Sequence, residues 1–163
     1  MTTHILAVCA GNICRSPAAE AAIRAEAERA GVDVEVDSAG TGSWSVGNAP
    51  HPQAVAAGAR AGLQIDGRAR RINSADFDRF DVIVVMDRAN LRDVLDLAPG
   101  LEDRAKVRLF RTFDPGTESE EVPDPYGGPD EGYDATIEQV AAAAAGLIDT
   151  LRSAGIENPI SLE

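Results

Sequence analysis

The sequence contains little sulfur, little imidazole and few aromatic rings. Its 163 residues include two cysteines, Cys9 and Cys14, and two histidines, His4 and His51, and aromatic residues make up 4%. Two neighbouring cysteines cannot build the disulfide framework of a secreted domain, so we expect a reducing, cytoplasmic setting. These residues show no metal-ligand spacing, so we expect no metal and no other cofactor. The core is predicted to consist mainly of alanine, valine, leucine and isoleucine.

Positive charge is also scarce. Fifteen Lys and Arg residues stand against twenty-seven Asp and Glu residues, which gives a net charge of −12. Such a surface repels a polyanion and argues against binding along a nucleic-acid backbone, although it leaves room for one local phosphate pocket. No apolar run approaches the ~20 residues that cross a membrane. Residues 1–5 lack the basic and apolar segments of a signal peptide, so we expect no membrane association.

The order of apolar segments predicts one α/β domain. Short apolar runs at residues 5–8 and 82–86 are typical of buried parallel strands, residues 32–36 suit a strand near a sheet edge, and residues 106–110 could form the last strand. Helical patterns occupy residues 53–61, a short segment with Leu91, Val94 and Leu95, and a long segment from Ile137 to Leu151. This alternation predicts a single three-layer domain: an open, four-stranded parallel sheet with helices on both faces.

Three further features complete the predicted outline. Ser16 is expected to cap a helix that has Pro17 as its first residue and ends at Gly31. Residues 112–133 are Gly/Pro-rich and acidic and contain no Lys or Arg, so a loop that is either functional or disordered is expected there. The domain is predicted to cover residues 1–155, and residues 156–163 are predicted to form a loose C-terminal tail.

The segment from Cys9 to Ser16 carries most of the chemical information. It reads Cys-Ala-Gly-Asn-Ile-Cys-Arg-Ser and lies between a predicted strand and a predicted helix. A short loop entering a helix can turn its N–H groups inward around an anion, and Gly11 and Asn12 tolerate the positive φ that this requires. Arg15 adds a bidentate grip on phosphate oxygens. These positive groups would favour the thiolate form of Cys9 and aim it at a bound oxyanion.

Other interpretations of this segment carry less weight. A lone cysteine after a strand is usually a buried structural residue, and a Cys-x5-Arg pair arises readily by chance. The loop could instead hold a nucleotide phosphate, but the two common nucleotide-binding glycine patterns, GxxxxGK[ST] and GxGxxG, are missing. The complete octapeptide in its strand–loop–helix setting favours a nucleophilic phosphate site.

The octapeptide together with Pro17 closely resembles the phosphate loop of low-molecular-weight protein tyrosine phosphatases. The resemblance continues in family order and spacing through four further segments: Asp37-Ser38-Ala39-Gly40-Thr41, Trp44 with Val46-Gly47, Met86-Asp87, and Asp124-Pro125-Tyr126-Gly127. It therefore runs from near the N-terminus to the last helix. The resemblance implies the fold of that family and the hydrolysis of phosphotyrosine in protein substrates.

The resemblance also implies the role of each site residue. Cys9 would attack phosphorus and form a phosphocysteine intermediate, while Arg15 and the loop amides stabilise the equatorial oxygens. Asp124 would act as general acid and then as general base, although an aspartate before proline is also ordinary turn chemistry. The implied phosphate loop and its supports comprise Ala10, Gly11, Asn12, Ile13, Cys14 and Ser16, with Ser38 behind them.

Specificity and regulation are implied in the same way. Ile13, Trp44 and Tyr126 would form the substrate pocket, with the two aromatic rings on either side of the phosphotyrosine ring. Cys14, either a small core residue or a redox partner, could form a reversible disulfide with Cys9 against over-oxidation. The expected partners are phosphotyrosine-containing proteins, and we expect a monomer.

Departures from the family pattern keep alternatives open. Tyr126 is followed by glycine rather than by a second aromatic residue, a form that also resembles protein-arginine phosphatases of the same fold. Those proteins usually carry threonine where this chain has Ile13, which favours phosphotyrosine. Gly67 stands near the place where relatives often have histidine. Arsenate reductases share the loop but need further cysteines. A non-catalytic phosphopeptide-binding module would typically lack Cys9 or Asp124.

Overall fold

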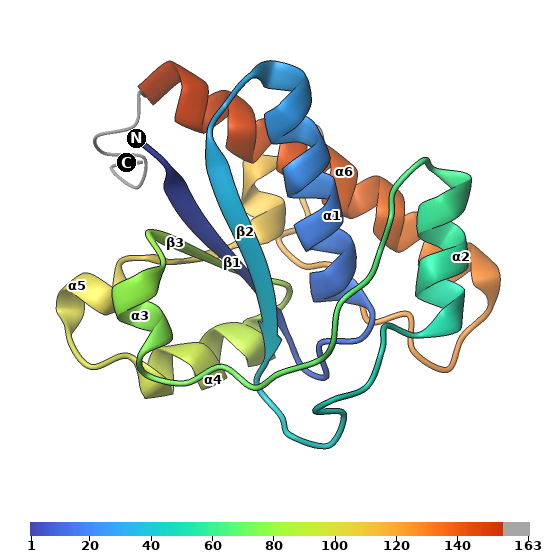
Figure 1. The fold of residues 1–163 in the computed structure, drawn as a ribbon, viewed down its shortest axis with the longest axis horizontal. Helices are drawn as coiled ribbons and strands as arrows, with labels where there is room; N and C mark the ends of the chain where they lie inside the picture. Colours follow the sequence, from blue (N-terminus) through green and yellow to red (C-terminus); the bar gives the residue numbers. More distant parts are fainter. Residues whose placement is uncertain (155–163) are drawn as a thin grey trace.

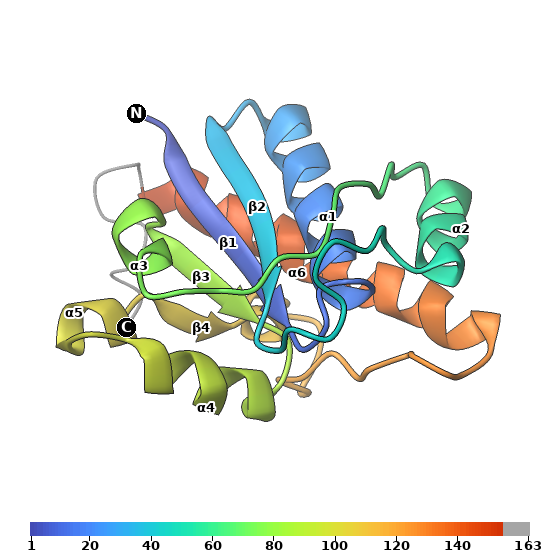
Figure 2. The ribbon, with the colours of Figure 1, turned by 60° about the horizontal axis from the view of Figure 1, so that its bottom comes forward.

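A computed structural model describes residues 1–154 and contains one parallel sheet of four strands. The strands lie in the order β2-β1-β3-β4, of which Figure 1 labels the first three and Figure 2 all four. All three pairings are parallel, and β1 pairs with β2 on one side and with β3 on the other. The strand bounds are β1 Thr3–Cys9, β2 Val34–Gly40, β3 Val82–Val85 and β4 Val107–Leu109. The predicted sheet is therefore confirmed, with β2 at an edge as expected.

Helices cover both faces of this sheet because successive residues of the central strands point to opposite sides. Ile5 and Ala7 pack under α1 (Arg15–Ala30), α2 (Pro52–Arg60) and α6 (Asp130–Ala154). Leu6 and Val8 face the other core, beneath α3 (Asp76–Arg79) and α4 (Arg88–Leu97). The short helix α5 (Leu101–Arg104) and the 3-10 helix η1 (Phe110–Phe113) flank β4 (Figure 2). The three-layer prediction is thus confirmed.

The start of α1 differs from the prediction. The helix begins at Arg15, its N-cap is Cys14, and no side chain caps it. The Ser16 hydroxyl instead contacts the Cys9 Sγ at 3.0 Å and accepts a hydrogen bond from the Asn12 Nδ2 at 2.8 Å. Ser16 does not cap the helix, although serine is favoured at that position, because its hydroxyl makes these contacts within the loop. Gly31 ends α1 in the left-handed conformation, as expected.

Two other boundaries shift. Strand β2 continues to Gly40, beyond the predicted end at residue 36, since it pairs along the whole length of β1. Helix α6 begins at Asp130 rather than at Ile137, so part of the predicted acidic loop is helical. The short helices α3 and α5 were not predicted. The predicted tail, residues 156–163, lies outside the described residues. None of the helices in residues 1–154 is long and apolar enough to cross a membrane.

Candidate active site

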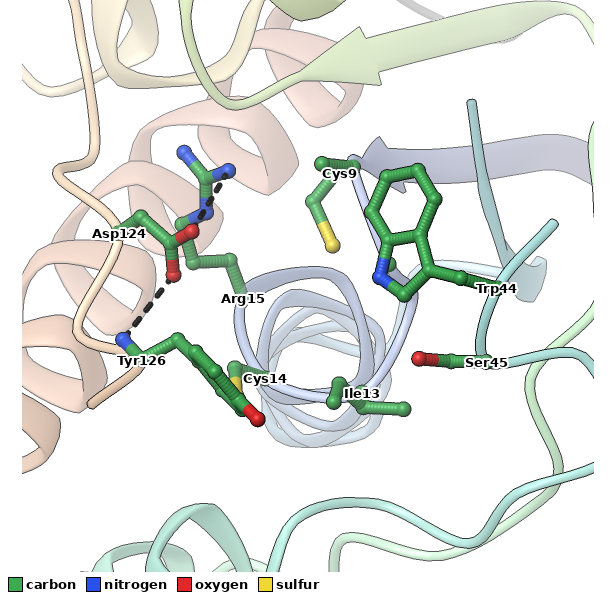
Figure 3. Close-up of a pocket in the computed structure, with 10 residues that line it drawn as sticks. Cys9, Ile13, Cys14, Arg15, Trp44, Ser45, Asp124 and Tyr126 are labelled. Atoms are coloured by element: carbon green, nitrogen blue, oxygen red, sulfur yellow. Dashed lines mark hydrogen bonds and ion pairs between the residues drawn. The ribbon is translucent and has the colours of Figure 1, made fainter. Parts of the chain in front are cut away.

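The candidate site lies where β1 ends and α1 begins. Cys9 is the last residue of β1 and Arg15 the first of α1, at the carboxyl edge of the sheet where the chain turns to β2 on one side and to β3 on the other. Ligands of open parallel sheets bind at this kind of switch point. A cavity of about 290 Å³ opens there (Figure 3), and it is lined by Cys9, Ala10, Gly11, Ile13, Cys14, Arg15, Trp44, Ser45, Asp124 and Tyr126.

One residue of the phosphate loop, Asn12, has an unfavourable backbone conformation. Asn12 has a φ of 59° and is the one residue other than glycine with positive φ in residues 1–154. Gly11, for which positive φ was expected, does not have it, so that expectation is wrong. Gly11 instead leaves room for a neighbour, because a Cβ added there would lie 3.3 Å from the Trp44 Nε1. Asparagine tolerates the left-handed region better than most residues.

Side-chain hydrogen bonds hold Asn12 in that conformation. Its Nδ2 donates to the hydroxyls of Ser16 at 2.8 Å and Ser38 at 3.0 Å, and its Oδ1 accepts from the backbone N–H of Arg70 at 3.0 Å. Ser38 in turn donates to a carboxylate oxygen of Glu20 at 2.8 Å. Ser38, predicted to support the loop, and Ser16 therefore lie in one network behind it.

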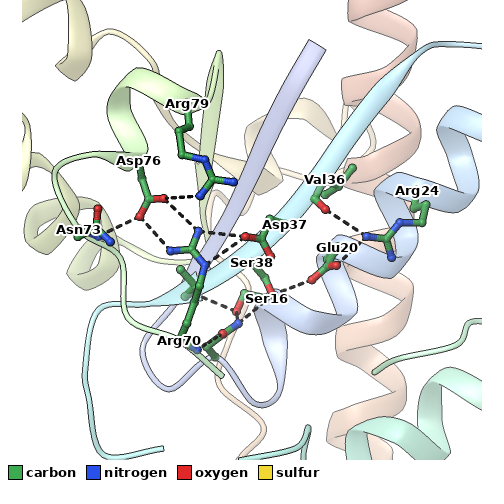
Figure 4. Close-up of polar contacts among 12 residues, drawn as sticks. Ser16, Glu20, Arg24, Val36, Asp37, Ser38, Arg70, Asn73, Asp76 and Arg79 are labelled. Carbon is green, nitrogen blue, oxygen red and sulfur yellow. Dashed lines mark hydrogen bonds and ion pairs between the residues drawn. The ribbon is translucent and has the colours of Figure 1, made fainter. Parts of the chain in front are cut away.

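A buried charge fixes the segment that supplies the Arg70 N–H. The Arg70 guanidinium donates to both oxygens of Asp76, at 3.1 Å each, and also to Asp37 at 3.1 Å (Figure 4). Asp76 is 1% exposed and also accepts from the backbone N–H of Asn73. An ion pair this buried stabilises its segment chiefly through geometry and full hydrogen bonding. Burial lowers the pKa of Arg70, but the hydrogen bonds and charges of Asp76 and Asp37 outweigh burial, so the pKa is raised overall.

The Cys9 thiol lies at the floor of the loop. Its Sγ accepts a hydrogen bond from the Asn12 N–H at 3.3 Å and contacts the Ser16 hydroxyl at 3.0 Å. Cys9 is 3% exposed. The sulfur therefore faces the inward-turned backbone of the loop, where a bound anion would lie.

Arg15 lies beside this floor and is itself buried. Its Nη1 donates to the Asp87 Oδ2 at 2.7 Å and to the Val122 carbonyl at 2.9 Å. The other oxygen of Asp87 accepts from the Asn90 N–H and caps α4. Sequence reasoning did not identify Asp87 as a site residue. Its position two residues after the end of β3, before a helix at the same sheet edge, is the signal that could have indicated it.

Asp124 stands at the rim of the cavity. Its Oδ2 lies 3.9 Å from the Arg15 Nη2, and its Oδ1 accepts a hydrogen bond from the Tyr126 N–H at 3.1 Å. The side chain is 53% exposed. Figure 3 shows it next to Arg15, on the opposite side of the cavity from Trp44. A carboxyl group in this position can exchange a proton with an atom of a bound ligand and with water.

Apolar side chains form the mouth of the cavity. Trp44 and Tyr126 are 70% and 63% exposed and stand on opposite sides of it, with Ile13 between them (Figure 3). Trp44 lies directly over Gly42, where an added Cβ would fall 1.6 Å from the indole ring. Ser45, which the sequence did not single out, also lines the wall. A flat group could lie between the two rings and gain from aromatic contact.

Cys14 lies at the base of the same cavity, 4% exposed. Burial, reinforced by the nearby Cys9 and Asp124, raises the pKa of Cys14 to about 12. Burial and the adjacent Cys14 also raise the pKa of Tyr133, which projects from α6. Cys14 therefore keeps its proton at neutral pH.

The residues described by the structure, 1–154, contain no group of three or more His, Cys, Asp or Glu side chains that could hold a metal ion. All residues predicted to form the site, Ser38 included, meet at this one edge of the sheet. Ser38 lies behind the loop and the others line the cavity or the loop itself.

Comparison with known proteins agrees with this geometry. The family model described as "Low molecular weight phosphotyrosine protein phosphatase" matches residues 4–156. A low molecular weight protein-tyrosine-phosphatase of Streptomyces coelicolor is 44% identical, covering 93% of this chain and 95% of that protein. A solved protein tyrosine phosphatase from Entamoeba histolytica is 34% identical with a TM-score of 0.90, covering 93% of this chain and 98% of that one.

A solved structure of the YwlE arginine phosphatase shares the fold at greater sequence distance. It is 25% identical, with a TM-score of 0.84, covering 98% of this chain and 100% of that one. The family model and the relatives nevertheless agree on one assignment. The chain belongs to the low molecular weight phosphotyrosine protein phosphatase family.

Proposed function

We propose that this protein is a protein tyrosine phosphatase that works through a phosphocysteine intermediate. One observation carries the proposal: the Cys9 thiol, the Arg15 guanidinium and the Asp124 carboxyl line one cavity of a size to admit an aryl phosphate. A nucleophile, an anion-binding group and a proton donor are the three components that phosphate-ester cleavage requires. No cofactor is needed, because these three side chains supply the nucleophile, the charge and the proton.

In the first step the Cys9 thiolate attacks phosphorus from the floor. The S–P bond forms as the bond from phosphorus to the phenolic oxygen breaks. Arg15 and the backbone N–H groups of residues 10–16 stabilise charge on the three equatorial oxygens. Asp124 gives its proton to the departing oxygen, so the tyrosine leaves as a neutral phenol.

In the second step water enters at the place that the phenol leaves. Asp124, now a carboxylate, takes a proton from that water, whose oxygen attacks phosphorus. The S–P bond breaks, inorganic phosphate forms and Cys9 returns as the thiolate. Ser16 supports both steps because its hydroxyl stands 3.0 Å from the sulfur and can donate to the thiolate. Asn12 and Ser38 keep the N–H groups of the loop aimed inward.

The shape of the cavity supports phosphotyrosine as the substrate. Trp44 and Tyr126 would hold its ring between them, and Ile13 gives the wall an apolar surface. A phosphate on serine would be too close to its own backbone to reach Cys9 at the floor. The likeness to the YwlE arginine phosphatase and the single aromatic residue after Pro125 make phosphoarginine the second candidate. A binding module without turnover is a third reading, which the presence of Asp124 disfavours.

We also propose that Cys14 protects Cys9 during oxidation. Hydrogen peroxide would convert the Cys9 thiolate to a sulfenic acid and be reduced to hydroxide. The sulfur of Cys14 would then attack that of Cys9, forming a disulfide and releasing the Cys9 hydroxyl as water with the Cys14 proton. A thiol reductant restores both cysteines. Peroxide treatment followed by mass measurement tests this: wild type should form the disulfide, whereas Cys14→Ala should accumulate sulfinic acid.

The protein partners are proposed on the same basis. Phosphotyrosine-containing proteins fit the cavity, and the single catalytic unit of residues 1–155 is proposed to act as a monomer in the cytoplasm. The two free cysteines support a reducing compartment. The net charge of −12 argues against nucleic-acid partners.

Phosphate release from matched phosphotyrosine and phosphoarginine peptides, in EDTA and reductant, tests the proposed function. Wild type should release phosphate faster from phosphotyrosine, and Cys9→Ser should release none. Faster release from phosphoarginine would keep the mechanism and replace the substrate. Release from neither peptide would refute a protein phosphatase and favour the binding module.

A further inference from the structure

The beginning of α2 is attached to the wall of the active site by an unusual cap. The His51 Nδ1 accepts a hydrogen bond from the Gln53 N–H at 3.2 Å and so caps the helix. The backbone N–H of the same histidine donates to the carbonyl of Ile13 at 2.9 Å. Ile13 belongs to the phosphate loop and lines the cavity. One residue therefore joins the helix to the loop.

The His51 ring also lies between two tyrosines. It meets Tyr126 edge to face with ring centroids 5.5 Å apart, and it stacks on Tyr133 at 5.6 Å with an interplanar angle of 16°. Tyr133 is 1% exposed and belongs to α6, so it is a fixed platform. Tyr126 is 63% exposed and forms one side of the cavity mouth. The His51 ring thus links an exposed side chain at the cavity mouth to a buried one on α6.

Gln53 makes a second connection, to the part of the chain that follows Tyr126. Its Nε2 donates to the Asp130 Oδ1 at 2.9 Å and to the Gly128 carbonyl at 3.3 Å. These contacts join residues 75 and 77 positions apart in the chain. Figures 1 and 2 both show α2 beside the part of the chain that leads into α6.

The acid loop, residues 123–128, needs such contacts because it has few of its own. Upstream it is fixed by the Val122 N–H, which donates to the Met86 carbonyl at 2.8 Å, and by the Val122 carbonyl, which accepts from Arg15. Asp124 itself accepts one local hydrogen bond, from Tyr126, and its side chain is 53% exposed. The position of its carboxyl group therefore depends on where the downstream end of the loop is held.

We propose that His51 and Gln53 are positioning residues that hold the acid loop so that Asp124 reaches the leaving oxygen. This inference rests on the proposed phosphatase function and concerns its proton-transfer step. Loss of either contact would let the loop move away from the cavity while the floor, Cys9 and Arg15, stays in place. The consequence is specific: only substrates that need a proton on the leaving group should suffer.

Two simple substrates separate this effect from general damage. Phenyl phosphate has a poor leaving group that depends on protonation, whereas 4-nitrophenyl phosphate has a good one that depends on it little. The value of kcat/KM for each reports the step that releases the phenol. Asp124→Asn measures the full effect of the general acid on kcat/KM, since general acids contribute about 10²- to 10⁴-fold to the rate.

Four variants isolate the contacts. His51→Asn keeps a cap for the helix but removes the ring between the tyrosines, and His51→Phe keeps a ring but removes the cap. Gln53→Glu keeps the size of the side chain but cannot donate to the Gly128 carbonyl. Arg60→Gln is the matched control, because Arg60 joins the other end of α2 to Asp134 on α6 at 2.7 Å, without a hydrogen bond to the acid loop.

The expected result is a change in substrate ratio. His51→Asn and Gln53→Glu should each lower kcat/KM for phenyl phosphate about tenfold, a small part of the full general-acid effect, and for 4-nitrophenyl phosphate less than about twofold. His51→Phe and Arg60→Gln should leave the ratio within about twofold of wild type. Gln53→Glu changes a partly exposed polar side chain, so it tests the inference even if a His51 variant fails to fold.

Three results would overturn the inference. These are an unchanged ratio in both His51→Asn and Gln53→Glu, an equal loss on both substrates, or the same change in Arg60→Gln. Failure of the proposed function gives a different result, because the wild type would then show no turnover of either substrate that Cys9→Ser abolishes. In that case the inference fails with it.

Discussion

The conformation of Asn12 makes a quantitative prediction about the phosphate loop. Asn12→Ala removes three hydrogen bonds and leaves an ordinary residue at a φ of 59°. Asn12→Gly removes the same three bonds but accepts that φ without strain. The two variants therefore separate the cost of the lost contacts from the cost of the backbone conformation.

The magnitudes follow from the contacts. Three hydrogen bonds at about 1 kcal/mol each give a loss of about 3 kcal/mol in the free energy of unfolding. In the folded state, the left-handed backbone costs alanine about 1–2 kcal/mol more than glycine. The greater flexibility of glycine in the unfolded chain reduces this difference between the two variants by about 0.4–1 kcal/mol. Asn12→Gly should thus lose about 3 kcal/mol and Asn12→Ala about 1 kcal/mol more. In both variants the loop amides lose their direction, so inorganic phosphate should inhibit less strongly.

Urea unfolding of wild type and both variants measures the first quantity, and inhibition by phosphate measures the second. Ser43→Ala, a change in the neighbouring surface loop, is a suitable control for handling and concentration. Alanine and glycine variants of equal stability would show that the backbone at Asn12 is not strained. Unchanged phosphate inhibition in both would show that Asn12 does not organise the anion site.

Three further predictions concern burial, packing and charge. The pKa of Cys14 rises from an ordinary 9.0 to about 12, so the unfolded chain loses this proton first as pH rises. Stability of wild type should therefore fall above pH 9 by up to about 1.4 kcal/mol per pH unit more than that of Cys14→Ala, as measured by urea unfolding; equal slopes would contradict it. Gly146→Ala should destabilise by at least about 2 kcal/mol, since its Cβ would lie 1.8 Å from the backbone oxygen of Phe113, whereas helix propensity alone predicts a gain of about 1 kcal/mol. Asp87→Asn should tighten phosphate inhibition about tenfold by removing the competing charge beside Arg15, and weaker inhibition would refute this.

The parts of the fold that were predicted correctly depend on neighbours in sequence. Residues 82–86 form a strand because they are apolar throughout and bounded by aspartates, and β3 spans Val82–Val85. Gly31 ends α1 because a left-handed residue must follow the helix there. The octapeptide indicated the candidate site for a similar reason, because Cys9, the loop and Arg15 lie within one short segment.

The parts that were missed depend on contacts between distant segments. Ser16 has the local pattern of a helix cap, but the Asn12 side chain and the Cys9 thiol engage its hydroxyl. Asp87 pairs with an arginine 72 positions earlier, and Gln53 binds a loop 75 positions later. Neither periodicity nor local propensity predicts such pairs, because the distance between the two partners depends on the order of the strands in the sheet.

The partners of Arg15 bear on turnover as well as on binding. The Nη1 of its guanidinium donates to Asp87 and to the Val122 carbonyl, and the Asp124 carboxylate lies 3.9 Å from its Nη2. A phosphate group must therefore share this cation with resident acceptors instead of receiving all of its attraction. Sharing weakens the attraction of Arg15 for inorganic phosphate as well as for a phosphate ester. Such sharing trades ground-state affinity for easier release of a bound anion.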